Sequence, residues 1–238
     1  MKAIIYAAGL GTRLKPWTDK HPKALAIVNG KTLLQRNIEY LQLHGFRDVV
    51  VNVHHFADQV KQAIEDNDGW GSKVTISDES DGLLETGGGL VKAAPLLQGD
   101  DFFLSVNADI LTNLNIKSLL DNFKKSNALI SFAVSDRATS RKILLDETNQ
   151  MCGWRNSSTG EEKIVRPSVT KNAMAYSCVT LYSSKVFDLI TTTGKFSIMD
   201  EFLKLAADHT VTGVPHQGDK WIDVGTTENL AKAEAMFL

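Results

Sequence analysis

The chain has 238 residues, of which 43% are hydrophobic and 23% are charged, and its formal net charge at pH 7 is −2. This length and composition are typical of one large globular α/β domain with a substantial core. The small net charge excludes the broad basic surface of a nucleic-acid-binding protein, so an anionic ligand must be bound by local groups. No uninterrupted apolar stretch approaches the length of a transmembrane helix, so no membrane partner is expected.

The N-terminus and the cysteines indicate the compartment. The chain opens as a structured strand without the charged and apolar regions of a signal peptide. Cys152 and Cys178 are the only cysteines and show no C-x-x-C spacing, which suggests neither a zinc site nor a disulfide framework. Free thiols in a reducing cytoplasm are favoured over a disulfide between the two. We therefore expect a cytoplasmic protein.

The first half of the chain alternates apolar strands with amphipathic helices. Apolar runs predict strands over residues 3–6, 49–53, 73–77 and 102–106, and apolar residues at helical spacing predict helices over 33–44, 57–65 and 88–97. Gly45 is the expected C-cap of the first helix. This alternation predicts a three-layer, Rossmann-like α/β fold with a mostly parallel sheet.

The second half is less regular. Strands are expected over residues 129–134, 142–146, 152–155, 177–182 and 211–214, and helices over 184–190, 198–209 and from 227 onward. No repeat, linker or low-complexity segment divides the chain. We therefore expect a single domain over residues 1–238, with two functional halves of about 1–110 and 111–238.

A glycine-containing loop directly follows the first strand. The sequence Ala7-Ala8-Gly9-Leu10-Gly11-Thr12-Arg13-Leu14 places small residues and two glycines at the strand end, where backbone N–H groups can approach a phosphate. Arg13 adds a bidentate cation, and Lys23 adds a point charge shortly afterwards. Taken alone, both are ordinary surface charges, but in this loop phosphate contact is favoured. Open α/β sheets bind ligands at this edge, so the loop predicts a nucleotide site.

Two commoner glycine motifs are excluded. A dinucleotide fingerprint needs a third glycine where Leu14 stands, and an acidic residue after the second strand, which instead runs into His54-His55. A P-loop ending at Gly30-Lys31-Thr32 would need its first glycine at Leu25. The latter tripeptide therefore predicts a turn before the helix that begins near Leu33.

A second glycine-rich segment precedes the third helix. It reads Leu84-Glu85-Thr86-Gly87-Gly88-Gly89-Leu90, and three consecutive glycines permit close approach of a flat ligand such as a nucleobase. A flexible turn at a helix start is the plainer alternative. The neighbouring phosphate loop favours the ligand-binding interpretation.

Two aspartates each lie at an apolar strand end. Asp109 ends Asn107-Ala108-Asp109, and Asp223 lies within Trp221-Ile222-Asp223-Val224-Gly225-Thr226. Two converging carboxylates suit Mg²⁺, which takes waters and substrate phosphates as its remaining ligands. Either aspartate alone could be a helix cap or turn residue. The adjacent His54 and His55 point to opposite faces of a strand, so a strand-end cap or a contact with the nucleotide is favoured there over a metal site.

These motifs, in this order, resemble the signature of the sugar-1-phosphate nucleotidylyltransferases over nearly the whole chain. The signature residues are Ala-Ala-Gly-Leu-Gly-Thr-Arg-Leu-x-Pro, Pro22-Lys23-Ala24-Leu25, Asp109 and Trp-x-Asp-Val-Gly-Thr. The resemblance implies the nucleotide-diphospho-sugar transferase fold, Mg²⁺ held by Asp109 and Asp223, and a nucleoside triphosphate and a sugar 1-phosphate as substrates. No left-handed β-helix repeat follows the core, which excludes the bifunctional acetyltransferase members.

Within the family, the Glu85–Gly89 turn is most similar to the uridylyltransferases of cell-wall recycling. These enzymes act on N-acetylmuramate 1-phosphate, which implies UTP and that sugar. The chain departs from the family pattern at Ala24, at Ala108, near Tyr176-Ser177-Cys178 and at Val165-Arg166-Pro167. The last two departures fall on the sugar side and leave the sugar open.

The hypothesis is a direct transfer in which the sugar phosphate attacks the α-phosphorus and pyrophosphate leaves. It needs no side-chain base, because the nucleophile is already an anion. The expected catalytic residues are Arg13, Lys23, Asp109 and Asp223, with Arg13 on the leaving phosphates and Lys23 bridging the reacting ones. The expected nucleotide contacts add Ala8, Gly9, Gly11, Thr12, Glu85, Gly87, Gly88 and Asn107, and the expected sugar contacts are Asn107, Tyr176 and Trp221.

Two alternatives stay open. One is another nucleotide–sugar pair, such as GTP with a mannose or heptose 1-phosphate, or dTTP with glucose 1-phosphate. The other is a regulatory protein that binds nucleotide sugars without turnover, which the two aspartates argue against because simple binding needs no magnesium pair. The sequence does not fix the oligomeric state, and a monomer or small homo-oligomer is expected.

Overall fold

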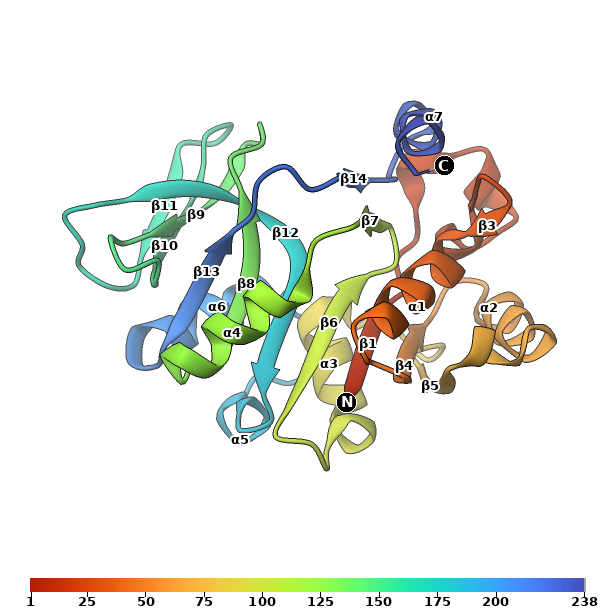
Figure 1. Cartoon of the computed structure of the whole chain (residues 1–238), viewed down its shortest axis with the longest axis horizontal. Coiled ribbons are helices and arrows are strands. Elements are labelled where there is room, and N and C mark those ends of the chain that lie inside the picture. The colour runs from red at the N-terminus through yellow and green to blue at the C-terminus, as the bar shows by residue number, and fades with distance from the viewer. Residues whose placement is uncertain (238) are drawn as a thin grey trace.

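The computed structural model describes residues 1–237 and shows a mixed sheet with helices on both faces (Figure 1). Four parallel strands form its first half, in the spatial order β6-β1-β4-β5. Their bounds are β1 (Lys2–Tyr6), β4 (Asp48–Val53), β5 (Lys73–Asp78) and β6 (Phe102–Asn107). All four strands lie where the apolar runs predict them, to within a residue.

Alternation along β1 explains the three layers. Ile5 packs in one apolar cluster with α1 (Leu33–Leu43) and α2 (Ala57–Asp66). Ile4, one residue earlier, packs in a second cluster with α3 (Glu85–Leu97) on the opposite face. Successive strand residues point to opposite faces, so an apolar strand such as β1 must be covered by helices on both sides.

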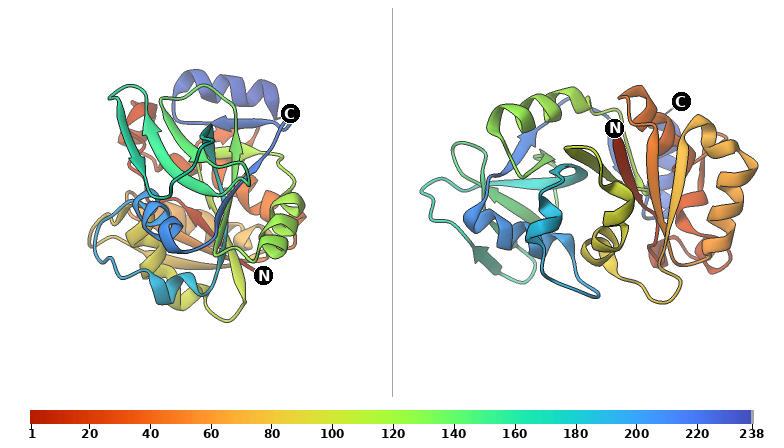
Figure 2. Two further views of the ribbon diagram at one scale, coloured as in Figure 1. Left: turned by 90° about the vertical axis from the view of Figure 1, so that its left-hand side faces the viewer. Right: turned by 90° about the horizontal axis from the view of Figure 1, so that it is seen from below.

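The second half continues the same sheet with antiparallel strands. The long strand β12 (Asn172–Ser183) pairs with β6, β8 and β9, which joins the two halves through backbone hydrogen bonds. A ribbon of β9, β10 and β11 forms the end of the molecule farthest from α2 (Figures 1 and 2). The remaining bounds are β8 (Ile130–Ser135), β9 (Arg141–Leu145), β10 (Met151–Asn156), β11 (Glu161–Ile164) and β13 (Val211–Pro215).

Helices of the second half pack on this mixed part of the sheet. The phenyl ring of Phe202 on α6 stacks on Phe132 of β8, with ring centroids 5.5 Å apart. Phe123 of α4 packs in the first apolar cluster. The bounds are α4 (Ile116–Ser126), α5 (Val186–Leu189), α6 (Ile198–Asp208) and α7 (Thr227–Met236).

Two sequence expectations about these elements were wrong, and one helix was not predicted. The third helix begins at Glu85 rather than at residue 88, so the glycine triplet lies inside its first turns. The helix expected over 184–190 is a single turn, because Ser183–Lys185 continue from β12 into a tight bend. Helix α4 was not predicted, although Ile116, Leu119 and Phe123 are buried at helical spacing.

Two small ribbons complete the fold. The hairpin of β2 (Ile27–Val28) and β3 (Lys31–Thr32) turns through Asn29 and Gly30 with φ of 46° and 77°, and Thr32 caps α1. The turn predicted before this helix is therefore confirmed. The second ribbon pairs β7 (Ile110–Thr112) with β14 (Trp221–Asp223), two segments more than a hundred residues apart in sequence.

The remaining elements are short 3₁₀ turns: η1 (Thr12–Leu14), η2 (Trp17–Asp19), η3 (Lys23–Leu25) and η4 (Asp68–Gly71). Cys152 and Cys178 are both free thiols, as expected. Within residues 1–237, no helix combines the length and the apolar character that crossing a membrane requires.

Candidate active site

The loop after β1 is held by backbone geometry. Gly11 has a φ of +63°, and a Cβ there would lie 2.9 Å from Thr18 Cγ2 and 3.0 Å from Lys23 Cβ. A Cβ on Gly9, in contrast, would meet no protein atom within 4 Å. Packing therefore requires a glycine at position 11, whereas position 9 faces free space that a ligand can use.

Four charged side chains of the predicted site converge. Lys23 Nζ lies 2.5 Å from Asp109 Oδ2 and 3.7 Å from Asp223 Oδ1. Arg13 Nη2 lies 3.4 Å from Asp223 Oδ2, and the Arg13 side chain is 65% exposed. Two cations and two carboxylates thus form one cluster, with the lysine between the aspartates.

The β7–β14 ribbon sets the distance between the two aspartates. Asp223 pairs with Ile110, and the Val224 N–H donates to the Asp109 carbonyl at 2.8 Å. Asp223 therefore ends a short ribbon strand instead of a strand of the main sheet. A Cβ on Gly225 would lie 2.7 Å from Arg13 Nη2, so this glycine leaves room for the arginine.

The carboxylates fit a hard divalent cation. Asp223 Oδ1 is buried and accepts no hydrogen bond, since Lys23 Nζ lies at an ion-pair distance too long for one. Among residues 1–237, no group of three or more His, Cys, Asp or Glu side chains is arranged to hold a metal ion. Proteins bind Mg²⁺ through one or two carboxylates together with waters and substrate phosphates, so Asp109 and Asp223 are a donor set of the kind that this ion takes.

A cleft of ≈130 Å³ lies at the carboxyl ends of β1 and β6. It brings together four of the predicted site residues: Gly9, Lys23, Asn107 and Asp109. Ala8, Gly11 and Thr12 belong to the same loop but do not line this cleft. The cleft therefore has the loop on one side and Asp109 on the other.

The glycine triplet at the start of α3 has a packing role. A Cβ on Gly87 would lie 2.3 Å from the Phe196 ring, one on Gly88 2.1 Å from the Gly194 carbonyl oxygen, and one on Gly89 2.6 Å from Glu79 Oε1. The side chain of Glu85 is exposed and pairs with Lys195 at 3.6 Å. A nucleobase contact by Glu85, Gly87 and Gly88 stays a prediction, because the contacts with residues 194–196 and Glu79 already account for the glycines.

A buried polar pair that the sequence did not reveal ties these two loops together. Asn52 Oδ1 accepts from the Ala7 N–H at 2.7 Å, and Asn52 Nδ2 donates to Glu79 Oε1 at 2.7 Å. Glu79 Oε2 in turn accepts from the Leu84 N–H at 3.1 Å. The ends of both glycine-containing loops are therefore fixed to one buried carboxylate. His54, as expected, caps a strand end by contacting the Glu79 carbonyl at 2.8 Å.

A larger cavity of ≈900 Å³ opens on the other side of the charged cluster. Arg13 and Asp223 line it, together with the predicted sugar contacts Tyr176 and Trp221. The Trp221 indole N–H donates to the Ser177 carbonyl at 2.9 Å, and the Tyr176 hydroxyl bonds Thr180 at 2.7 Å. Both aromatic side chains are therefore fixed walls. Asn107 faces the smaller cleft instead.

Cys178 also lines this cavity, where the register between β12 and β8 shifts. Its φ is +60°, a conformation that favours glycine. The departure noted near residues 176–178 therefore falls at a backbone position that favours glycine. Burial, with a smaller contribution from Asp109, raises the pKa of the Cys178 thiol to about 12.

A Ser–His–Asp chain, which the sequence did not reveal, stands behind the cavity wall. Ser177 Oγ lies 2.8 Å from His216 Nε2, and His216 Nδ1 lies 3.2 Å from Asp219 Oδ2. Burial lowers the pKa of His216, and Asp219 opposes that effect. Ser177 is fully buried, so no substrate can reach its hydroxyl. The hydrogen-bonded series of Ser177, His216 and Asp219 therefore supports β12 and the segment before Trp221.

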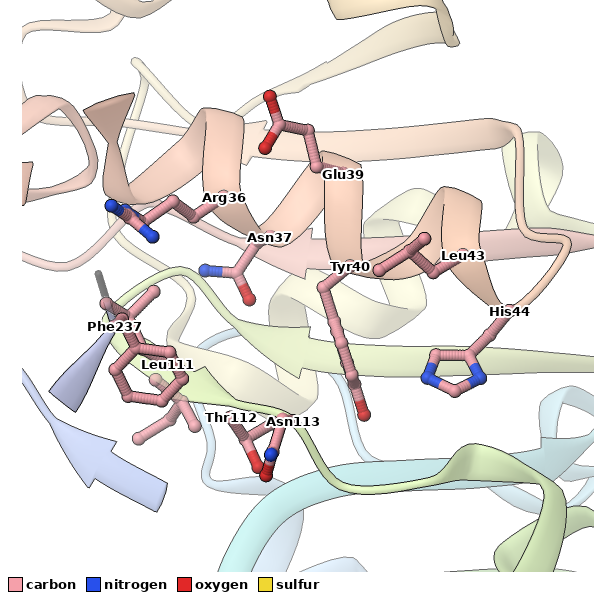
Figure 3. Close-up of a pocket in the computed structure, with 11 residues that line it drawn as sticks. Arg36, Asn37, Glu39, Tyr40, Leu43, His44, Leu111, Thr112, Asn113 and Phe237 are labelled. Carbon is pink, nitrogen blue, oxygen red and sulfur yellow. The ribbon is translucent and has the colours of Figure 1, made fainter. Parts of the chain in front are cut away.

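A separate cleft of ≈210 Å³ lies between α1, β7 and Phe237 (Figure 3). Two of its polar side chains already have partners: the Tyr40 hydroxyl donates to the Leu114 carbonyl, and Arg36 donates to the Val28 carbonyl. None of the predicted site residues lines it. The site is therefore at the two cavities that meet at the charged cluster.

Fold and site together define a nucleotidyl-transferring protein of α/β architecture. The sequence matches the family model described as nucleotidyl transferase over residues 2–238, and the chain belongs to this family. Its fold is accordingly the nucleotide-diphospho-sugar transferase fold, and its chemistry is that of a sugar-1-phosphate nucleotidyltransferase.

Two relatives are similar over almost their whole length. The chain is 32% identical to an N-acetylmuramate alpha-1-phosphate uridylyltransferase of Neisseria meningitidis, covering 99% of this chain and 98% of that one. It is 31% identical to a protein of the same name from Caulobacter vibrioides, covering 98% and 95%. The crystal structure of HddC from Yersinia pseudotuberculosis has the same fold, with a TM-score of 0.80 at 22% identity over 100% of this chain and 99% of that one.

Proposed function

We propose that this enzyme transfers a uridylyl group from UTP to N-acetylmuramate 1-phosphate, releasing pyrophosphate. Two relatives at 31–32% identity carry that name, and the resemblance of the Glu85–Gly89 turn noted in the sequence points to the same enzymes. The observation that carries the proposal is the cluster of Arg13, Lys23, Asp109 and Asp223 between two cavities.

The proposed step is a single displacement at phosphorus. An oxygen of the sugar phosphate forms a bond to the α-phosphorus, while the bond from that phosphorus to the oxygen bridging the β-phosphate breaks. The electron pair of the broken bond leaves with pyrophosphate. Since the attacking oxygen is already anionic, the protein supplies position and positive charge rather than a base.

The chain's own cations take different parts in this step. Lys23 has a side chain only 12% exposed and lies between the two carboxylates, so it is placed to contact both reacting phosphates. Arg13 is mostly exposed at the end of the phosphate loop, where it can follow the leaving pyrophosphate into solvent. An exposed guanidinium on the leaving group and a more buried ammonium at the reacting centre are complementary.

Asp109 and Asp223 are the residues that would hold Mg²⁺. The bound ion would supply neutralisation of the charge that develops on the phosphates. Lys23 lies between the two carboxylates and is therefore placed beside any phosphate bound there. Asn107 and the open face of Gly9 line the cleft beside them and are the proposed nucleotide contacts there.

The test is pyrophosphate release across five triphosphates (ATP, UTP, GTP, CTP and dTTP) and a panel of sugar 1-phosphates with MgCl₂. UTP with N-acetylmuramate 1-phosphate should give the highest kcat/KM. A preference for GTP with mannose or heptose 1-phosphate, or for dTTP with glucose 1-phosphate, would contradict the proposed substrates. It would still support nucleotidyl transfer to a sugar 1-phosphate. Absence of pyrophosphate release with every pair would favour a protein that only binds nucleotide sugars.

A further inference from the structure

One arginine of the larger cavity has no place in the nucleotidyl transfer described above. Arg137 lies in the segment between β8 and β9, and its guanidinium carbon sits 4.1 Å from the centroid of the Trp221 ring. Its Nη2 donates to the Tyr176 carbonyl at 2.6 Å. Lys142 Nζ donates to the Arg137 carbonyl at 2.7 Å, which fixes the backbone of the same segment. The guanidinium is therefore held in one orientation.

One donor of this fixed guanidinium is left over. Arg137 Nε is buried and has no hydrogen-bond partner. Burying a charged donor without a partner is unfavourable, so proteins rarely leave one in place unless something binds there. Burial lowers the pKa of Arg137, and the negative charge of Asp223 opposes that effect only partly.

The charges around the cavity isolate Arg137 further. Arg13 pairs with Asp223, and Lys163 lies 3.4 Å from Glu161 and 3.9 Å from Asp200. Within residues 1–237, no carboxylate oxygen lies within 4.0 Å of an Arg137 nitrogen. The wall of the larger cavity therefore carries a fixed, half-buried guanidinium that has no carboxylate partner among these residues.

We propose that Arg137 binds a carboxylate carried by the sugar ring of the sugar 1-phosphate, so that the enzyme selects an acidic sugar. The inference rests on the proposed function in that the larger cavity is the sugar side. A carboxylate accepts two parallel hydrogen bonds from a guanidinium, and Nε together with one Nη is a pair of donors arranged for this. A neutral hexose would leave the buried charge unpaired, so the site rejects it.

The chemistry of the proposed substrate fits this assignment. N-acetylmuramate carries a lactyl ether that ends in a carboxylate, and N-acetylglucosamine is the same sugar without that ether. The stacked Trp221 ring covers one face of the guanidinium, which leaves its edge for the acid. Arg137 is accordingly a specificity-determining residue that contacts substrate away from the reacting phosphates.

The experiment compares N-acetylmuramate 1-phosphate with N-acetylglucosamine 1-phosphate, using UTP and MgCl₂, in the wild type and in Arg137→Met. The measured quantity is the ratio of the two kcat/KM values, in which any general damage to Trp221 or Tyr176 cancels. We expect Arg137→Met to lower this ratio about 10- to 100-fold, the range for loss of hydrogen bonds to a charged group. Arg137→Lys keeps the positive charge but loses the two parallel hydrogen-bond donors, so it should lower the ratio of kcat/KM values by less.

Arg155→Met is the matched control. It removes a guanidinium from the neighbouring strand β10, where Arg155 pairs with Glu162 at 2.6 Å and does not line the cavity. Its ratio should equal that of the wild type. If Arg137→Met lowers kcat/KM equally for both sugars, Arg137 contacts the common phosphate or only supports the wall, and the proposal is overturned.

A binding measurement separates this proposal from the proposed function. Calorimetric titration of the wild type with each sugar 1-phosphate needs no turnover. Tighter binding of the acidic sugar, lost in Arg137→Met, supports the carboxylate site even where pyrophosphate release fails. Equal binding of the two sugars by the wild type overturns the carboxylate site even where uridylyl transfer succeeds.

Discussion

The two cavities that meet at the charged cluster are built in different ways. The smaller cleft stands on the ends of parallel strands, and the two glycine-containing loops beside it are tied together through Asn52 and Glu79. The larger cavity stands on antiparallel strands and connecting segments, and it contains a buried arginine nitrogen without a partner. The first is a rigid frame for a ligand part shared by the family, and the second holds an unpaired charge that only a particular ligand satisfies.

This difference separates catalysis from specificity. In the proposed reaction, residues of the smaller cleft and the charged cluster would contact the phosphates, whose geometry is the same for every nucleotide and sugar. Residues of the second half face the part of the substrate that varies. Substitutions in the smaller cleft should therefore affect all substrates together, whereas substitutions in the larger cavity should affect some and spare others.

The largest expected effect follows from the two aspartates. Asp223→Asn should lower kcat about 10²- to 10³-fold for every substrate pair, because it removes one of two carboxylates suited to the metal. Asp109→Asn should lower kcat to a similar extent. Pyrophosphate release as a function of MgCl₂ concentration measures this.

Asp121→Asn is the control for the loss of a carboxylate, because Asp121 is exposed on α4 and pairs only with Lys117. Its turnover should match that of the wild type. Full activity in either active-site variant would remove the aspartates from the mechanism.

The next effect concerns stability and the glycine triplet. An exposed helical Gly→Ala change normally stabilises by about 1 kcal/mol. In Gly88→Ala the new Cβ would lie 2.1 Å from a backbone oxygen, so we expect a loss of about 1–3 kcal/mol in the free energy of unfolding instead. Urea denaturation measures the free energy of unfolding. A stabilised variant would show that residues 194–196 shift to make room for the new methyl group.

Gly9→Ala should show the opposite pattern. Its Cβ meets no protein atom, so the free energy of unfolding should change by less than about 0.5 kcal/mol. The added methyl occupies the ligand's space, so kcat/KM should fall about tenfold or more for all substrates. Steady-state kinetics beside urea denaturation distinguish the two effects, and unchanged kinetics would place the nucleotide elsewhere.

The smallest effect is a pH dependence in the wall of the larger cavity. His216 faces Asp219, Ser177 and Arg137, and burial lowers its pKa below 6.5. A depressed folded-state pKa means that this contribution to stability is fully present above pH 6.5 and is lost as the pH falls through the folded-state value. We expect a decline below about 1 kcal/mol, since solvent screens part of it.

Urea denaturation between pH 7.5 and 5 measures this decline. The glutamine of His216→Gln cannot become charged. In this variant, the part of the pH dependence of the unfolding free energy that is due to His216 should disappear. An identical slope in wild type and variant would show that His216 does not respond to pH in this way.

The sequence predicted the first half well because its signals are local. Gly9, Gly11, Arg13 and Lys23 lie within fifteen residues, and apolar strands with both faces buried are continuous in the sequence. The site residues of the second half depend on contacts between distant segments. Ser177 and His216 are 39 residues apart in the sequence, and β12 lies between Arg137 and Trp221 in the sequence. No local spacing therefore predicts either contact.

Helix α4 and the glycine triplet each have a sequence pattern, but the pattern of the triplet is ambiguous. The apolar spacing of α4 was present in the sequence. The glycine triplet is compatible with both a ligand contact and a packing requirement, and only the positions of Phe196 and Gly194 show the packing requirement. The β7–β14 ribbon, which sets the two aspartates beside Lys23, joins two three-residue strands that are too short to be recognised alone.

The central claim is a direct transfer with no enzyme-bound intermediate. Two nucleophilic side chains of β12 are unsuited to attack, because Ser177 is fully buried and burial raises the pKa of Cys178 to about 12. The decisive measurement is the stereochemical course at the α-phosphorus, followed with a UTP analogue that is chiral there. The account predicts inversion, the result of one in-line displacement, and retention would contradict it by requiring two.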